Sequence, residues 1–136
     1  MPALQFDNGD VLTENIAILS KIADKYPALM APGQFGRYRL LEMLAYIATE
    51  IHKAFHPLFD PGASETDKKM AGEAVAKKLS FVATKLEGPY LFGANATVAD
   101  FYLFVMLESL RRAHEVTADR AGGAAARRSH QVMLDG

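Results

Sequence analysis

The sequence predicts a mainly all-α protein, a bundle of four helices preceded by a small β-hairpin. Apolar residues recur at three- and four-residue spacing in four segments joined by short connections, which is the pattern of helices packed side by side. Near the start, Asn8-Gly9 separates two short apolar runs, and this dipeptide is typical of a tight hairpin turn. With 136 residues, of which 50% are hydrophobic, the chain can build one domain-sized core.

Composition excludes several classes of function. A net charge of -1 gives no basic surface for nucleic acid or for an anionic membrane. Without cysteine there is no disulfide framework, thiolate metal site or cysteine nucleophile. The first residues lack the pattern of a secretory signal, and no apolar run approaches the about 20 residues that span a bilayer. We therefore expect a soluble cytoplasmic protein.

The first elements are a hairpin and one helix. We expect strands at Ala3–Phe6 and Val11–Leu12, which are too short to be stable unless they lie on a helix or a larger sheet. The helix is expected from about Glu14 to Tyr26, with Thr13 as its N-cap. The following Ala31–Gly33 contains proline and glycine, and it predicts a linker at a domain boundary.

Two further helices fill the middle of the chain. The first is predicted over Gln34–Phe55, and His52 is expected at the shoulder of its apolar stripe, where small alanines leave space. The second is expected to end near Leu86, with Ser64 and Asp67 as a capping box at its start. The stripe of the first helix consists of Leu40, Leu44, Ile47, Ile51 and Phe55.

The last predicted helix runs from Thr97 to Leu110. Thr97 and Asp100 have the spacing of a capping box, in which each residue satisfies a backbone amide near the other. The run Phe101–Leu107 is apolar without interruption, and a helix that is apolar on all sides belongs in a core. We therefore expect this helix to be covered on every side.

The residues alone point to little chemistry. His52 and His56 have the spacing of a helical metal pair, but Pro57 ends the helix at the second one and no third ligand is evident, so we predict no metal site. Glu14 is a candidate ligand-binding carboxylate, although a glutamate in a first helical turn more often compensates the helix dipole. Composition and spacing by themselves predict a soluble helical domain.

The order of three segments resembles a known family. PALQFDNGDVLTENIAIL, YRLLEMLAYIATEIHKAFHPLF and TVADFYLFVML are similar to successive landmarks of bacterial glutathione transferases, particularly the beta class, over about Met1–Leu107. The resemblance implies a division into a remnant of a thioredoxin-like glutathione-binding domain, a helical C-terminal domain and an atypical mobile tail. These parts are residues 1–27, 34–112 and 113–136.

The resemblance also implies contacts with glutathione as co-substrate, without another cofactor, at three pairs of residues. These are Met1 and Pro2, Glu14 and Asn15, and His52 and Lys53. The first pair matches a Val-Pro unit whose proline is cis and whose preceding backbone pairs with the cysteinyl unit. The second matches a Glu-Ser or Glu-Gly that holds the γ-glutamyl end, with the larger asparagine as a departure, and the third matches a His-Lys pair near glutathione. Glu50 matches an acidic position near the subunit boundary of a homodimer.

Three departures from the family pattern affect the expected activity. The opening strand, helix and strand of the thioredoxin-like domain, where the family keeps its activating Cys, Ser or Tyr, have no counterpart in this sequence. Ala45 replaces an amide that contacts glutathione across the dimer in the family. The alanine- and arginine-rich tail lacks the family's aromatic patch and its Arg-Pro motif, and an altered reading frame after about Leu107 would explain it.

Two functions are therefore carried forward. In the first, the protein conjugates glutathione to apolar electrophiles, although the chain as given is expected to be inactive for want of an activating residue. In the second, it is a helical module derived from a transferase that dimerises or binds apolar compounds without catalysis.

Overall fold

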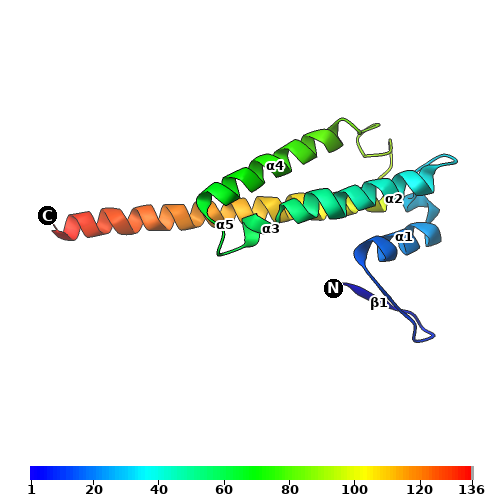
Figure 1. The fold of residues 1–136 in the computed structure, drawn as a ribbon, viewed down its shortest axis with the longest axis horizontal. Helices are drawn as coiled ribbons and strands as arrows, with labels where there is room; N and C mark the ends of the chain where they lie inside the picture. The colour runs from blue at the N-terminus through cyan, green and yellow to red at the C-terminus, as the bar shows by residue number, and fades with distance from the viewer. Residues whose placement is uncertain (136) are drawn as a thin grey trace. The chain divides into compact units, whose positions relative to one another are not determined.

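The computed structural model describes the backbone of residues 1–135, and it describes side chains except those of residues 117, 120, 121 and 124–136. The chain forms two compact units, Met1–Met106 and Leu107–Gly136, which are treated separately below. The elements are β1 (Ala3–Gln5), β2 (Val11–Thr13), α1 (Asn15–Lys25), the 3-10 turn η1 (Pro27–Leu29), α2 (Gly36–Tyr46), the π-helical segment η2 (Ile47–His52), α3 (His56–Phe59), α4 (Glu65–Ala83) and α5 (Val98–Asp135) (Figure 1). The mainly helical fold with a small β-hairpin, as predicted, is confirmed.

The hairpin is antiparallel, with Leu4 opposite Leu12. Its turn contains Gly9 at a φ of 91°, a backbone conformation that favours glycine. Both strands pack against α1, which supplies the support that two short strands need. Helix α1 in turn packs against α2, and an exposed ion pair of 3.0 Å joins Asp24 to Arg37 across the two helices.

The start of α1 differs from the prediction. Its N-cap is Glu14 rather than Thr13, because Thr13 is the last residue of β2 and its backbone is committed to the strand pair. No side chain caps this helix end. The first-turn amides of α1 therefore lack the side-chain acceptor that an N-cap threonine would have supplied.

The junction between α1 and α2 is tightly packed at Gly36. A β-carbon placed on this residue would lie 2.0 Å from the carbonyl oxygen of Ala31. Only a residue without a side chain fits so close to the linker backbone. Residues 31–33 lie between η1 and α2, and Gly33 has a φ of 89°, while the domain boundary expected there stays a prediction.

The helix predicted over Gln34–Phe55 changes type partway. The α2 segment ends at Tyr46 and continues as the π-helical η2 to His52. The Thr49 hydroxyl donates to the carbonyl of Ala45 at 2.9 Å, a bond of the kind that competes with the backbone ladder. The predicted apolar stripe is confirmed, since the exposed fraction is 2% or less for each of its members. These are Leu40, Leu44, Ile47, Ile51 and Phe55.

The capping box predicted for α4 is confirmed. The amide of Asp67 donates to the Ser64 hydroxyl at 3.1 Å, and the amide of Ser64 donates to the Asp67 carboxylate at 3.1 Å. The helix ends at Ala83, so Leu86 lies beyond it and has an exposed fraction of 48%.

The expectation that α5 is covered on every side is wrong for the single chain. Ala99, Tyr102 and Met106 are buried, whereas Phe101 and Phe104 have exposed fractions of 53% and 61%. Residues three and four apart lie on one helix face, so the buried set forms one face and Phe101 with Phe104 lies on another. Within this unit the first face is buried, whereas the two phenylalanines on the second face are more than half exposed. An unbroken apolar run thus does not by itself require burial on all sides.

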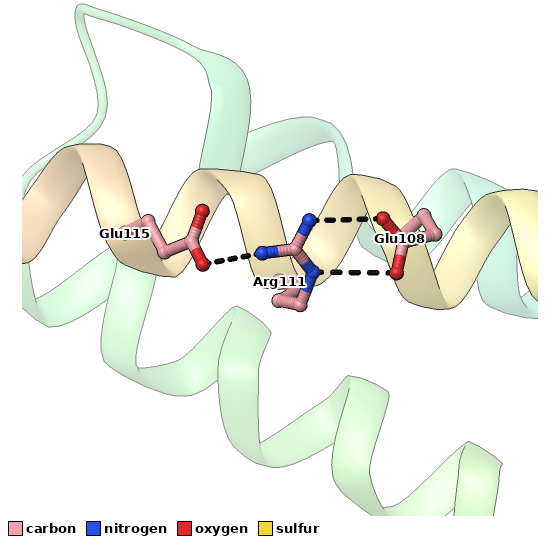
Figure 2. A network of polar contacts seen from close by, with 3 residues as sticks. All are labelled: Glu108, Arg111 and Glu115. Atoms are coloured by element: carbon pink, nitrogen blue, oxygen red, sulfur yellow. Dashed lines mark hydrogen bonds and ion pairs between the residues drawn. The ribbon is translucent and has the colours of Figure 1, made fainter.

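In the second unit, α5 continues past the predicted end at Leu110. Arg111 donates from Nε and Nη2 to the Glu108 carboxylate at 3.2 and 3.1 Å, and its Nη1 donates to Glu115 (Figure 2). Pairs three and four residues apart stabilise a helix, and the alanines that follow favour it further. The failure of apolar periodicity therefore did not mark a helix end. The mobility expected for residues 113–136 stays a prediction.

Candidate functional site

The beginning of α1 is the most unusual backbone in the described residues. Glu14 has a φ of 72° and a ψ of 125°, and no other non-glycine residue there has a positive φ. Such a conformation costs free energy and persists where surrounding structure or function holds it. Asn15 follows as the first residue of α1, whose uncapped amides and positive dipole end suit a carboxylate.

The first two residues precede β1. Met1 has an exposed fraction of 92%, and Pro2 is exposed as well. The Met1-Pro2 peptide bond is not cis, so the cis bond implied by the family resemblance is absent here.

His52 is the last residue of η2, and it contacts a residue that the sequence did not point to. Its Nδ1 lies 3.0 Å from the hydroxyl oxygen of Tyr102 on α5, and the two rings meet edge to face at 6.3 Å between centroids. Tyr102 is buried, with an exposed fraction of 7%, whereas His52 is largely exposed. Because 50 residues separate the two along the chain, no local sequence pattern could have paired them.

Lys53 follows His52 but faces a different environment. It lines an open cleft of about 600 Å³ beside α3 and α4, together with His56, Asp60 and Met70. Successive residues of a helix point in different directions, and His52 is not among the residues that line this cleft.

Glu50 forms an ion pair with Lys78 of α4. The hydrogen bond from Lys78 holds the pKa of the Glu50 carboxyl below its usual value, and the same bond raises the pKa of Lys78. The carboxylate is thus engaged within the chain and still partly exposed. Its role at a subunit boundary stays a prediction.

Thr97 and Asp100 form a box that differs in one bond from the predicted one. The amide of Thr97 donates to Asp100 Oδ2 at 2.8 Å, as expected, but the Thr97 hydroxyl accepts from the amide of Ala99 rather than from that of Asp100. The Thr97 hydroxyl is 3.0 Å from Asp100 Oδ2. The second carboxylate oxygen of Asp100 accepts from the amide of Leu91 at 2.8 Å, a tertiary contact that the sequence did not predict.

The predicted ligand residues fall into two groups. Within the part of the chain that the structure describes, no hydrogen bond or ion pair joins Glu14 or Asn15 to His52 or Lys53. Nor does that part contain a group of three or more metal-ligating side chains, or a helix long and apolar enough to cross a membrane.

Comparison with known proteins decides the family. Residues 47–121 match the family model described as "Glutathione S-transferase, C-terminal domain", which is more than half of the chain. The chain belongs to this family. The resemblance to bacterial glutathione transferases stated from the sequence is thereby confirmed.

Similar proteins are bacterial transferases. The chain is 42% identical over 111 residues to glutathione S-transferase GstA of Escherichia coli O157:H7, covering 79% of this chain and 55% of that protein. Two solved structures are each 46% identical with a TM-score of 0.67, covering 79% of this chain and 56% of theirs. One is a sphingomonad glutathione S-transferase complexed with glutathione, and the other a bacterial beta class glutathione S-transferase of Sphingomonas chungbukensis. The chain thus spans a little over half the length of these relatives.

Proposed function

We propose that the chain supplies part of the glutathione site of a transferase that conjugates glutathione to apolar electrophiles. Membership of the family supports the activity class, and a 46% identical relative whose structure contains glutathione supports the ligand. The observation in this molecule that carries the proposal is the strained backbone of Glu14 at the uncapped start of α1. A ligand carboxylate at these amides would account for a helix end without a side-chain cap.

The proposed contacts follow from charge and position. The γ-glutamyl end of glutathione carries a carboxylate and an ammonium, which suit the amides at Asn15 and the carboxylate of Glu14 respectively. His52 and Lys53 are donors for the anionic groups at the other end of the ligand. The backbone beside Pro2 would pair with the cysteinyl unit.

Glutathione binding is tested best by following individual amides by NMR. At about 10 mM glutathione we expect shifts at Asn15, Ile16 and Ala17, with an affinity weaker than millimolar, or about 4 kcal/mol or less. The dipeptide Cys-Gly lacks the γ-glutamyl unit and should not shift these amides. Glu14→Ala should abolish the response, and Glu73→Ala on the exposed face of α4 should retain it. Absence of selective shifts at residues 15–17 would overturn the proposal.

The same titration addresses the second pair of residues. His52→Ala should change the midpoint little, because the larger share of the contacts is proposed at α1. Micromolar binding that is lost in this variant would instead place the main contacts at His52.

Conjugation by the isolated chain is expected to be at least about two orders of magnitude slower than by full-length relatives, the usual scale of losing an activating group. The residues proposed here hold the ligand, and none of them is positioned as an activator of its sulfur. A conjugation assay with a chloronitrobenzene measures this directly. A turnover comparable to that of intact transferases would show that an activator has been missed.

Homodimer formation in the cytoplasm is also part of the proposal. The alternative, a module that dimerises or binds apolar compounds without catalysis, is favoured by the exposed Phe101, Phe104 and Val105 of α5. Sedimentation analysis, together with the conjugation assay, separates the two functions. A dimer that binds no glutathione would favour the alternative.

A further inference from the structure

The direction of the hydrogen bond between His52 and Tyr102 depends on which nitrogen of the neutral imidazole carries the proton. A phenol hydroxyl donates one hydrogen bond, and a buried one needs an acceptor. Nδ1 of His52 is at 3.0 Å from the hydroxyl oxygen, and Tyr102 is 7% exposed. No buried side-chain nitrogen or oxygen in the described residues lacks a partner. Nδ1 can accept the hydroxyl hydrogen of Tyr102 only in the tautomer that carries the imidazole proton on Nε2.

Tyr102 is held rigidly enough to act as an anchor. It lies in the second turn of α5, whose start is fixed by the bonds of Asp100 to Thr97 and to Leu91. Its neighbours on the buried face are Ala99 and Met106. A side chain packed in this way keeps one position for its hydroxyl.

His52 by contrast ends the π-helical segment η2 and is largely exposed. Segments of this type recur at functional sites. An exposed ring without a partner would rotate between rotamers and exchange between its two tautomers. The bond to Tyr102 removes both freedoms for the neutral ring.

From this geometry we infer that Tyr102 is a positioning residue for His52, fixing its ring so that Nε2 presents an N-H to an anionic group of the ligand. The ligand in this statement rests on the proposed glutathione function, whereas the hydrogen bond and the tautomer do not. Tyr102 itself is buried and touches the ligand only through His52. The arrangement parallels metal-binding histidines, in which a partner on one ring nitrogen sets the role of the other.

The tautomer is measured by nitrogen-15 NMR of the imidazole rings in the full chain without ligand. In the wild type at neutral to alkaline pH, we expect His52 with a protonated Nε2 and an acceptor Nδ1. Tyr102→Phe removes only the hydroxyl, and it should shift Nδ1 toward the average of a freely exchanging ring. The rings of His56 and His114 should not change.

Tyr46→Phe is the matched control, because Tyr46 packs on Phe81 and not on His52. It should leave the His52 spectrum unchanged. Far-UV circular dichroism confirms that both variants are folded. A wild-type His52 protonated on Nδ1, or a His52 spectrum that is the same in Tyr102→Phe, would overturn the inference.

Adding glutathione to the wild type and to Tyr102→Phe tests this inference separately from the proposed function. In the wild type the ligand should shift the His52 ring signals, and in Tyr102→Phe that shift should fall by half or more while the shifts at residues 15–17 persist. If glutathione shifts no residue of the wild type, the proposed function fails and the assigned tautomer still stands. If the His52 shift is the same with and without the hydroxyl, the positioning role is refuted although glutathione binds.

Discussion

The starts of α4 and α5 carry the same four-residue pattern in different surroundings. At α4, Ser64 and Asp67 are exposed, and in the described part of the chain their side chains form hydrogen bonds only with each other's residue. At α5, Thr97 is 2% exposed, and Asp100 binds the amide of Leu91 as well as that of Thr97. The first box caps the start of α4 and does nothing more. The second caps the start of α5 and also joins the preceding loop to the helix through the hydrogen bond to Leu91. The contribution of a capping motif thus depends on whether its acceptor also serves a distant donor.

Among the substitutions in the two boxes, removing the Asp100 carboxylate should reduce the free energy of unfolding most. Asp100→Ala leaves the amides of Leu91 and Thr97 without acceptors, and both residues are buried. Because each unsatisfied buried amide costs about 1–3 kcal/mol, we expect a loss of about 3 kcal/mol in the free energy of unfolding in urea. Asp100→Asn keeps one carbonyl oxygen and should lose less. A loss in Asp100→Ala no greater than that of an exposed cap would remove the distinction between the boxes.

Removing the hydroxyl should likewise reduce stability more at Thr97 than at Ser64. Thr97→Ala is expected to cost about 1 kcal/mol and Ser64→Ala about half of that, since losing an exposed cap falls at the low end of the range. The double variant Thr97→Ala with Asp100→Ala should be less destabilised than the sum of the single ones, because both act on one network. Additive losses in urea midpoints would show that Thr97 and Asp100 do not act together.

The smallest expected effect is a pH dependence of stability that comes from the exposed box of Ser64 and Asp67 at the start of α4. Hydrogen bonds from the side chain and then the amide of Ser64 hold the pKa of Asp67 below its usual value of 3.8. A carboxyl whose folded pKa is depressed stabilises the fold above 3.8, and that stabilisation is lost as pH falls through the folded pKa. Asp67→Asn should therefore flatten the loss of stability below this pH, whereas Glu65→Gln in the same turn should not. An unchanged acid limb in Asp67→Asn would argue against the bond in solution.

Much of the fold could be predicted because its causes are local or periodic. The hairpin follows from Asn8-Gly9, the α4 box from Ser64 and Asp67, and the core of the second helix from its apolar spacing. The change from α to π helix at Ile47 was not predicted, since the apolar stripe is compatible with both. The exposure of Phe104 was not predicted. The sequence shows that this helix face is apolar, but it does not show which residues pack against it.

The candidate site was predicted in part. Family resemblance pointed to Glu14 and His52, but the strained backbone of Glu14 depends on how β2 meets α1, and the sequence instead favoured Thr13 as the cap. The partner of His52 lies 50 residues further along the chain. A tyrosine on a buried helix face is ordinarily a core residue, and only the three-dimensional structure gives its hydroxyl a specific partner.

The packing at Gly36 has a consequence for how this sequence can vary. A β-carbon there would lie 2.0 Å from the Ala31 carbonyl oxygen, whereas one at Gly72 on α4 would meet nothing within 4 Å. In a library of alanine replacements selected for folded molecules, Gly36→Ala should be depleted, while Gly72→Ala should be enriched because alanine is the better helix former. Substitutions can thus accumulate along α4, while the passage from α1 into α2 tolerates only glycine at this position.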